Sequence, residues 1–330
     1  MPFLFNEMNM HSLFADIKPF ADQTFEKDGH RIYYEQSGNP DGIPVCVLHG
    51  GPGGGSTGKL RSFFDPNDYH IIMFDQRGCG QSRPHAQLDN NSLSDLMSDM
   101  EYIRKKLNIK KWMLFGGSWG TTLSLIYAQT YPDNVLAMIL RGVFLAREQE
   151  YKWLYDEGAS RIFPDQWELF TDHVDGKTGA ALLEAFYQQL TSKNEIKRMG
   201  AARAWVNWEG SCSTLKPSKE TITGLLDPRV ALPMALISVH YFLNYCFIEE
   251  NQIINNMDKI SHIPSVIVHG RYDMVCTLDN ATELYKHWEN CELDIIREAG
   301  HSAFEPSIRD ALLKACVNMA RQLGKDESKA

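Results

Sequence analysis

The 330-residue sequence lacks a long apolar run, an excess of basic residues and any paired spacing of its cysteines. A helix that spans a membrane needs about 18 or more uninterrupted apolar residues, and no segment reaches that length. The first 20 residues contain acidic side chains and lack a basic start followed by an apolar run, so they do not predict a signal peptide. From these absences we expect a cytoplasmic protein with no membrane partner.

The charge balance argues against a nucleic-acid partner. Lys and Arg total 33 and Asp and Glu total 42, which gives a formal net charge of -9 at pH 7. An acidic chain repels phosphate backbones, and no run of Lys and Arg forms a basic stripe that could overcome this repulsion. We therefore expect no nucleic acid among the partners of this chain.

The cysteines indicate a reducing compartment. There are seven, an odd number scattered along the chain, and none has the spacing of zinc ligands or of a redox motif. Most of these thiols are expected to be ordinary core residues. The sequence predicts neither a metal nor another cofactor, and it does not indicate the oligomeric state.

The composition is that of a folded protein with room for a catalytic core and an insertion. Hydrophobic residues make up 43% of the chain and charged residues 23%, as in soluble globular proteins. Short apolar runs alternate with helical patterns, which is typical of a parallel sheet, after a first hairpin that turns at Asp28. We expect the later strands at residues 44–48, 69–74, 112–116, 135–140, 264–269 and 292–296.

Two helices have clear boundary signals, and one long region lacks strand signals. Ser92 and Asp95 form a capping box before an amphipathic helix, and the last helix is predicted to begin at Pro306 and end near Gly324. Between 146 and 250 the segments become helical and rich in aromatic residues, most of which helix packing alone would explain. We interpret this region as a helical insertion.

A serine between glycines follows one of the predicted strands. Residues 116–120 are Gly-Gly-Ser-Trp-Gly, between a strand and a helix, which is the context that a nucleophile elbow requires. Glycines are needed because the turn is sharp, and Ser118 stands beside a helix N-terminus. Residues 54–58 also match the pattern, but Ser56 lies inside a glycine-rich loop, so we interpret it as a turn residue.

A serine hydroxyl becomes a nucleophile when a histidine, oriented by a carboxylate, accepts its proton. Asp273 directly follows the strand 264–269, and His301 directly follows the strand 292–296. The carboxyl ends of parallel strands meet at one edge of the sheet, where Ser118 also emerges. In proteins with this elbow motif, the triad residues follow along the chain in the order serine, acid, histidine. We expect these three residues to form a catalytic triad.

Other residues compete for the acid and base roles. Asp279 is expected at the start of a helix and Asp294 within a strand, so neither should point to the edge of the sheet. His49, His240 and His269 fit structural roles better. The triad and the alternating elements together predict an α/β-hydrolase fold, a mostly parallel sheet flanked by helices.

We expect a catalytic domain formed by residues 1–145 and 251–330, with a helical cap at 146–250.

The oxyanion of a tetrahedral intermediate needs two preorganised donors. The amide of Trp119 and a glycine-rich loop at 49–55 can supply them, since glycines let the backbone approach a substrate. A phosphate cradle is the alternative use of such a loop, but no Gly-Lys-Ser or Gly-Lys-Thr closes it.

These motifs resemble those of the proline iminopeptidases, also called prolyl aminopeptidases. The resemblance rests on residues 49–55, 74–80, 116–120 and 270–273, with shorter matches at 140–142 and 157–161. It implies a capped serine hydrolase that releases an N-terminal proline from small peptides without a metal.

The resemblance also implies roles for individual residues. It assigns the oxyanion hole to the amides of Gly51 and Trp119. It assigns binding of the free amine of the substrate to Glu209, and it places Phe144 and Cys276 in the wall of the proline pocket.

The chain departs from the family pattern at two positions. Ser238 stands two residues before a His-Tyr-Phe motif, where relatives carry a second glutamate, and Leu154 stands where an aromatic residue is expected. These departures do not affect the fold or the triad, but they leave strict selectivity for proline undecided.

The main alternative function is an esterase or general amidase with the same fold, and a second is a non-catalytic binding protein. Glu209 discriminates between the first two, because a buried carboxylate suits an amine and not a neutral ester.

Overall fold

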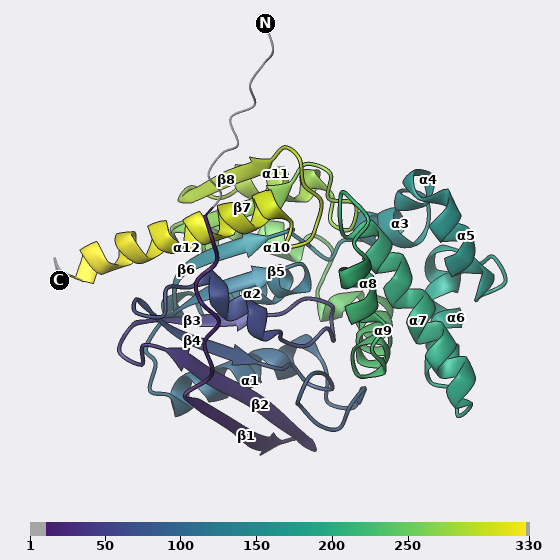
Figure 1. Cartoon of the computed structure of the whole chain (residues 1–330), viewed down its shortest axis with the longest axis horizontal. Coiled ribbons are helices and arrows are strands. Elements are labelled where there is room, and N and C mark those ends of the chain that lie inside the picture. Colours follow the sequence, from purple (N-terminus) through teal and green to yellow (C-terminus); the bar gives the residue numbers. More distant parts are fainter. Residues whose placement is uncertain (1–10, 328–330) are drawn as a thin grey trace, which may run out of the picture.

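The computed structural model describes residues 11–327 of the chain (Figure 1). The prediction about a signal peptide rests partly on residues 1–10, which lie outside the described part. No single helix within residues 11–327 is long and apolar enough to cross a membrane. The pair α8 (Lys219–Leu225) and α9 (Pro228–Leu243), bent by 78°, passes the same test by length and composition alone.

Within the described residues, eight strands form one sheet in the order β1-β2-β4-β3-β5-β6-β7-β8. The first three in this order pair antiparallel, and the remaining strands are parallel. The predicted hairpin and the six predicted strands are confirmed, with ends that differ by a residue or two. The strands are β1 (Ala21–Lys27), β2 (His30–Gly38), β3 (Ile43–Leu48), β4 (Tyr69–Phe74), β5 (Trp112–Gly117), β6 (Val135–Arg141), β7 (Ser265–Gly270) and β8 (Cys291–Ile296).

Alternate side chains of the central strands serve two separate hydrophobic cores. In β3, Cys46 and Leu48 belong to one core, whereas Val45 and Val47 belong to the other. This alternation is the period of two that a strand imposes. Both faces are apolar, as expected of a parallel sheet covered by helices on both sides.

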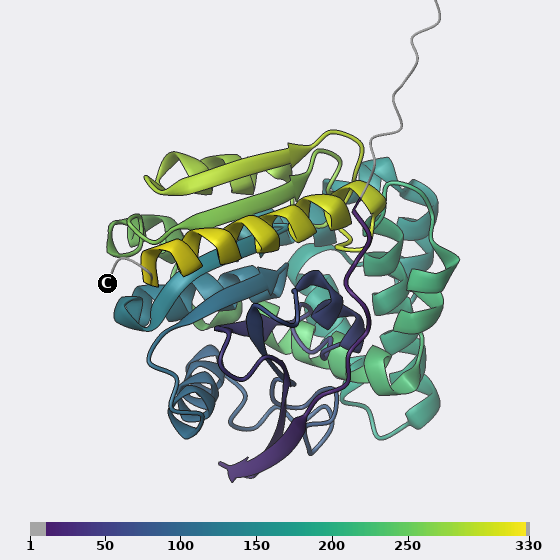
Figure 2. The same ribbon diagram turned by 60° about the vertical axis from the view of Figure 1, so that its left-hand side comes forward.

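Helices cover each face of the sheet (Figure 2). One core includes side chains of α1 (Leu93–Lys106), α2 (Trp119–Thr130) and α11 (Leu278–Lys286). The other is covered by α12 (Pro306–Glu327) and the 3-10 helix η1 (Gly58–Phe63). The predicted capping box of α1 is present, with Ser92 and Asp95 bonded reciprocally.

The last helix differs from its prediction at one end. It begins at Pro306 as expected, but it runs through Gly324 to Glu327. A Cβ at Gly324 would meet nothing within 4 Å, so this glycine lies on an open helix surface. Glycine there costs only about 1 kcal/mol of helix propensity, which is too little to end a long helix by itself.

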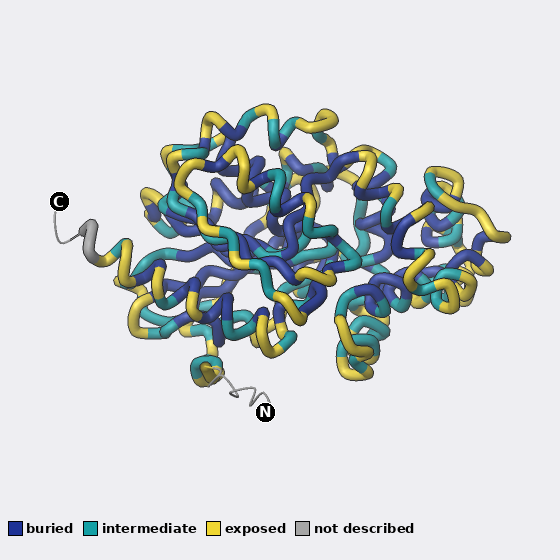
Figure 3. The backbone as a smooth tube through the Cα atoms, turned by 90° about the horizontal axis from the view of Figure 1, so that it is seen from above, coloured by how far each residue is buried: buried dark blue, intermediate teal, exposed yellow. Residues whose placement is uncertain are grey.

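A group of helices is inserted between β6 and β7 and lies beside the carboxyl edge of the sheet (Figure 1). Buried residues follow the strands and the inner sides of these helices, and exposed residues follow their outer turns (Figure 3). The inserted helices are α3 (Glu148–Tyr155), α4 (Ala159–Ile162), α5 (Pro164–Asp172), α6 (Gly179–Leu190), α7 (Glu195–Cys212), α8 (Lys219–Leu225) and α9 (Pro228–Leu243). Short connecting helices are η2 (Pro132–Asn134), η3 (Tyr245–Phe247), α10 (Gln252–Asn255) and η4 (Met257–Lys259).

Candidate active site

Ser118 lies on the sharp turn between β5 and α2. Its φ of 57° and ψ of -125° fall in a region that costs an L-residue roughly 1–3 kcal/mol. The turn leaves no room for neighbouring side chains, because a Cβ at Gly120 would come 2.2 Å from the carbonyl oxygen of Leu48. The Ser118 amide donates to the Arg141 carbonyl at 2.9 Å. The strained turn therefore raises the hydroxyl above the carboxyl edge of the sheet.

Asp273 and His301 meet at the same edge. Asp273 Oδ2 accepts a hydrogen bond from His301 Nδ1 at 2.7 Å, and both residues are buried. Asp273 Oδ1 accepts from the amides of Val275 and Cys276 at 3.0 and 2.8 Å. These partners fix the carboxylate and, through it, the plane of the imidazole.

The pKa directions suit a base and an orienting acid. Burial would raise the pKa of Asp273, but His301, His269 and the amide of Cys276 together hold it below its usual value. Burial lowers the pKa of His301, with Asp273 opposing the shift. Near neutral pH the site therefore contains an ionised Asp273 and a neutral His301, the form that can accept a proton.

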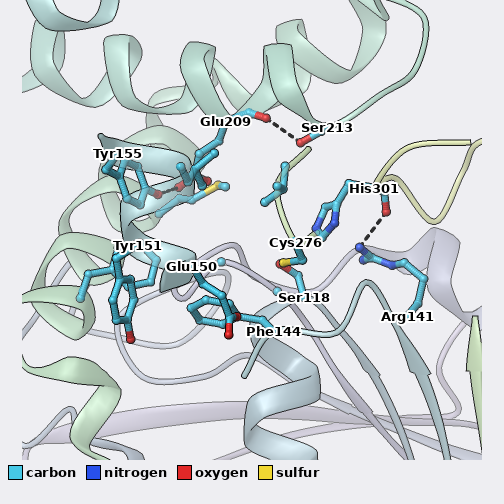
Figure 4. A pocket seen from close by; sticks show the side chains of 16 residues that line it. Ser118, Arg141, Phe144, Glu150, Tyr151, Tyr155, Glu209, Ser213, Cys276 and His301 are labelled. Atoms are coloured by element: carbon cyan, nitrogen blue, oxygen red, sulfur yellow. Dashed lines mark hydrogen bonds between the residues drawn. The ribbon is translucent and has the colours of Figure 1, made fainter. Parts of the chain in front are cut away.

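The hydroxyl of Ser118 faces the thiol of Cys276 (Figure 4). Within residues 11–327, His301 Nε2 has no hydrogen-bond partner, so the bond between Ser118 and His301 is not formed in this structure. Hydrogen bonds between catalytic residues are often long without substrate and shorten in the complex. A turn of the Ser118 side chain about χ1 changes the direction of its hydroxyl without backbone movement.

The competing acids and bases lie elsewhere or have other partners. Asp279 and Asp294 are exposed and do not line the cavity that contains Ser118. His269 Nδ1 accepts from the amide of Val143 at 3.2 Å, so its proton is on Nε2, which donates to the carbonyl of Cys276 at 2.9 Å. Because both ring nitrogens are occupied by structural bonds, His269 braces the loop that carries Asp273.

The glycine-rich loop after β3 approaches Ser118 closely. A Cβ at Gly50 would come 3.3 Å from Ser118 Cβ, and Gly51 has a φ of 120°, which favours glycine. The Gly54 amide donates to the Gly50 carbonyl at 3.2 Å and tightens the turn. The amide of Trp119 opens α2 on the other side of the hydroxyl. Both predicted oxyanion donors thus belong to segments that flank Ser118.

A cavity of about 160 Å³ lies between the sheet edge and the inserted helices (Figure 4). Its lining contains the predicted site residues Ser118, His301, Gly51, Glu209, Phe144 and Cys276. Leu154 also contributes to the wall and is buried. The structure brings the triad serine and base together with the residues that the family resemblance assigned to substrate binding.

Glu209 is a buried acid of this cavity. It is carried by α7, is 7% exposed, and accepts a hydrogen bond from the Tyr155 hydroxyl at 2.6 Å. Burial raises the pKa of Glu209 to about 7, and the Tyr155 bond opposes the shift. Within the part of the chain that the structure describes, no Lys, Arg or His forms an ion pair with Glu209. The carboxylate therefore faces the cavity without a cation.

Glu150, a second acid in the cavity wall, already has partners within the protein. Its two oxygens accept from the amide of Leu145 at 2.8 Å and from Arg147 Nε at 3.0 Å. Arg147 also donates to Glu283 at 2.6 Å. Both oxygens of Glu150 have partners, which distinguishes it from Glu209.

Ser238 does not line the cavity. It is fully buried on α9, and its hydroxyl donates to the carbonyl oxygen of Pro52 at 3.0 Å. A Cβ at Gly53 would come 2.6 Å from the carbonyl oxygen of Pro233, so helix and loop pack closely. At this position the chain uses a small polar residue to join α9 to the glycine-rich loop.

Comparison with known proteins identifies the family. A sequence model of the α/β hydrolase fold matches residues 43–307. A proline iminopeptidase from Xylella fastidiosa (strain Temecula1 / ATCC 700964) is 48% identical over 308 residues, which cover 93% of this chain and 98% of that relative. The chain belongs to the proline iminopeptidases. The fold and the family predicted from the sequence are therefore confirmed.

Other proline iminopeptidases match over similar lengths. The one from Arabidopsis thaliana is 44% identical over 320 residues, 96% of this chain and 84% of its own length. The one from Neisseria gonorrhoeae is 43% identical over 296 residues, 89% of this chain and 94% of its own.

Solved structures share the fold of this chain. An esterase from Exiguobacterium antarcticum superposes with a TM-score of 0.62 at 19% identity, covering 89% of this chain and 97% of the esterase. A putative lipase from Acinetobacter baumannii AYE gives a TM-score of 0.63 at 16% identity, covering 94% of this chain and 93% of its own. At these identities the likeness concerns the fold alone.

Several residues that line the cavity were not predicted from the sequence. They are Arg141, Glu150, Tyr151, Tyr155, Ser213 and Phe242. One signal was present, because Tyr151, Leu154 and Tyr155 have the i, i+3, i+4 spacing of one helix face. That helix follows β6, the neighbour of the nucleophile strand, so its inner face was a candidate wall. No comparable signal marked Ser213, which lies at the end of α7.

The end of α7 is bonded to the loop of the base. The carbonyl of Ser213 accepts from the amides of His301 and Ser302 at 3.1 and 2.9 Å. Glu305 joins the same two segments, since its carboxylate accepts from the amides of Gly300 and Leu215 at 2.9 and 3.1 Å. The helix that carries the unpaired acid and the loop that carries the base are thus held together directly.

Proposed function

We propose that this protein is a serine aminopeptidase that releases an N-terminal proline from small peptides through an acyl-enzyme intermediate. Glu209 carries the proposal: it is a buried carboxylate, without a cationic partner among residues 11–327, in the cavity that contains Ser118. A buried charge is costly unless it is paired. The free amine of a peptide N-terminus supplies the missing positive charge.

In the acylation step, His301 Nε2 takes the proton of the Ser118 hydroxyl while the oxygen attacks the carbonyl carbon of the first residue. The amides of Gly51 and Trp119 donate to the oxyanion that forms. Asp273 stabilises the imidazolium through the 2.7 Å bond to Nδ1. When the tetrahedral intermediate collapses, His301 returns its proton to the leaving amine, and the first residue remains esterified to Ser118.

In the deacylation step, water replaces the departed peptide. His301 removes a proton from the water, the hydroxide attacks the ester carbonyl, and the same two amides hold the oxyanion. Collapse releases the free amino acid, and His301 returns the proton to Ser118. The enzyme ends in its starting state, so no cofactor is required by this cycle.

The cavity supports selection of a small cyclic residue. Phe144 and Cys276 contribute apolar walls beside Ser118, and Tyr155 holds Glu209 in place. Glu209 and Ser118 line the same cavity, so a substrate whose amine binds Glu209 presents the carbonyl of its first residue to the nucleophile. Leu154, where an aromatic residue is expected, leaves the wall less bulky, so we propose that alanyl substrates are cleaved more slowly but measurably.

We further propose that residues 146–250 act as a cap over a catalytic domain formed by 1–145 and 251–330, and that the enzyme works in the cytoplasm. The seven cysteines are free thiols, and six of them are buried, which suits a reducing compartment. The net charge of -9 supports peptides rather than nucleic acid as partners.

An esterase or general amidase with the same triad is the alternative. A neutral ester would leave the ionised Glu209 buried and without a partner, which disfavours the binding of such a substrate. A non-catalytic binding protein would not need the strained turn at Ser118, since such strain is retained mainly where it serves a function.

The test compares four substrates: prolyl arylamide, alanyl arylamide, N-acetyl-prolyl arylamide and a small aryl ester. We expect the highest kcat/KM for prolyl arylamide and a loss of at least about 100-fold on acetylation, because acetylation removes the charge that pairs with Glu209. Equal efficiency on the free and acetylated substrates would support the amidase alternative. No reaction of Ser118 with a fluorophosphonate probe would support the binding protein.

A further inference from the structure

The motif at residues 74–80 has no role in the mechanism described so far. Its third residue, Gln76, follows β4 and is only 2% exposed. β4 is the neighbour of β3, whose end leads into the glycine-rich loop. Gln76 therefore lies beside the start of the glycine-rich loop, and it is not among the residues that line the cavity.

The side chain of Gln76 is bonded to both segments. Its Nε2 donates to the carbonyl oxygen of His49 at 3.0 Å, and its Oε1 accepts from the indole Nε1 of Trp119 at 2.9 Å. A carbonyl can only accept and an indole N–H can only donate, so these partners determine which end of the amide is which. No other arrangement of the amide satisfies both.

A second set of bonds fixes the start of the loop. The backbone amide of Gln76 donates to His49 Nε2 at 3.1 Å, so the His49 proton is on Nδ1. Nδ1 lies 2.9 Å from the carbonyl oxygen of Gly50, to which it donates. Gln76 thus holds His49 by backbone and side chain, and His49 in turn holds the peptide that precedes Gly51.

We propose that Gln76 is a positioning residue of the oxyanion hole, which sets the separation of the Gly51 and Trp119 amides by bridging His49 and the Trp119 indole. The inference rests on the proposed function, because it takes these two amides as the oxyanion donors. Such donors act only when they lie about 2.7–3.1 Å from the developing charge. A bridge between their segments keeps both at that distance at no cost during the reaction.

The bridge should affect the reaction more than binding of the substrate. The oxyanion develops during attack, so its donors stabilise the transition state more than the bound substrate. Loss of the bridge is therefore expected in kcat. Binding of the amine and of the proline ring is assigned to Glu209, Phe144 and Cys276, which have no hydrogen bond with Gln76, and should be retained.

The test replaces Gln76 by leucine, which keeps the size and removes both side-chain bonds. Removal of one oxyanion donor lowers kcat by about 10²–10³ in a serine protease, so displacement of the donors by Gln76→Leu should lower kcat by about 10–100-fold, with KM within about threefold. Gln129→Leu is the matched control. Gln129 is also buried and donates to the carbonyl of Ile253 at 2.7 Å, at the far end of α2.

Two inhibitors separate positioning from general damage. A pyrrolidine boronic acid forms an adduct with Ser118 that places an oxygen among the oxyanion donors, whereas free proline occupies only the ground-state site. In Gln76→Leu the boronic acid should bind more weakly by the same factor as the loss in kcat, and proline should bind as in the parent. Equal weakening of both, or an unchanged kcat in a folded variant, would overturn the proposal.

Folding is checked by thermal unfolding of both variants. If Gln76→Leu does not fold, Gln76→Met, which keeps the length and flexibility of the side chain, is measured in the same way. The small aryl ester distinguishes this inference from the proposed function, because any acyl transfer at Ser118 needs the oxyanion hole. A parent that cleaves esters but not prolyl arylamide contradicts the proposed function, and the effect of Gln76→Leu on ester turnover then decides the inference alone.

Discussion

Replacing Glu209 by glutamine removes the charge of the proposed amine anchor and retains its size. The carboxylate is 7% exposed and its hydrogen bond from Tyr155, 2.6 Å long, can be kept by the amide oxygen. An ammonium about 4 Å from a carboxylate gains about 4 kcal/mol at an effective dielectric near 20, before the cost of removing water from both charges. Truncating one partner of a buried pair costs about 2–5 kcal/mol, so kcat/KM for prolyl arylamide should fall by about 30-fold to several thousand-fold.

The pH dependence gives the same prediction a second readout. Burial raises the pKa of Glu209 to about 7, so the free enzyme carries the neutral acid below that pH. Burial also lowers the pKa of His301, against the opposing effect of Asp273. The parent should therefore lose kcat/KM for prolyl arylamide below about pH 7, whereas its ester hydrolysis should persist to a pH below the ordinary imidazole value of about 6.5. In Glu209→Gln, kcat/KM for both substrates should fall only at the lower pH at which His301 takes up a proton.

Stability should change in the opposite direction to activity. A carboxyl group whose pKa is raised by folding binds more protons in the folded state than in the unfolded one, so stability falls as pH rises from about 4.5 to about 7. Glu209→Gln removes this cost. The variant should be more stable than the parent by up to about 3 kcal/mol at pH 8 and nearly equal to it at pH 4, measured by denaturant unfolding.

Glu150→Gln is the control for charge removal in the same cavity. Because both oxygens of Glu150 have partners within the protein, this variant should change amine and ester turnover alike. The assay is kcat/KM on prolyl arylamide and aryl ester for the parent and both variants, between pH 5 and 9. An amine-to-ester ratio that Glu209→Gln leaves unchanged, or that both variants lower equally, would refute the assignment of Glu209 as the amine anchor.

Four further substitutions test other parts of the site. Ser118→Ala should lower turnover of prolyl arylamide by about 10⁶, whereas Ser56→Ala, whose hydroxyl donates to a backbone carbonyl, should leave it within a few-fold. Asp273→Asn should lower kcat by about 10⁴ with native circular dichroism, because the His301 ring loses the partner that sets its tautomer; a loss of only a few-fold would reopen the choice of acid. Ser238→Glu should destabilise the fold by several kcal/mol, measured by its denaturant midpoint, since it buries a charge between α9 and the glycine-rich loop; tighter binding of amine substrates in a stable variant would contradict this.

The triad could be predicted because it depends on the sheet more than on side-chain packing. Ser118, Asp273 and His301 each follow a strand in the parallel part of the sheet, and parallel strands present their carboxyl ends at one edge. Their apolar runs and following glycines were readable without any structure. The expected positions of Asp279 in a helix and Asp294 within a strand then left Asp273 as the acid.

The cavity wall could not be predicted in the same way. Glu209, Tyr155 and Ser213 come from helices whose mutual orientation depends on long-range packing, and a helical pattern alone does not say which face covers the sheet edge. Glu209 was found only through the resemblance to a family. Gln76 belonged to the motif at 74–80, but its role could not be predicted, because a buried bridging amide is defined by its partners and these are distant in sequence.

The bonds from the Ser213 carbonyl to the amides of His301 and Ser302 limit how the protein can admit a substrate. An outward movement of α7 would either break these bonds or pull the imidazole of His301 away from Ser118. In a widely opened enzyme, Ser118 would thus lack its base and could not be acylated by a bound substrate. We therefore expect that folded proteins and long chains, which would force the helices apart, are not hydrolysed, and that peptides small enough to enter the intact cavity are.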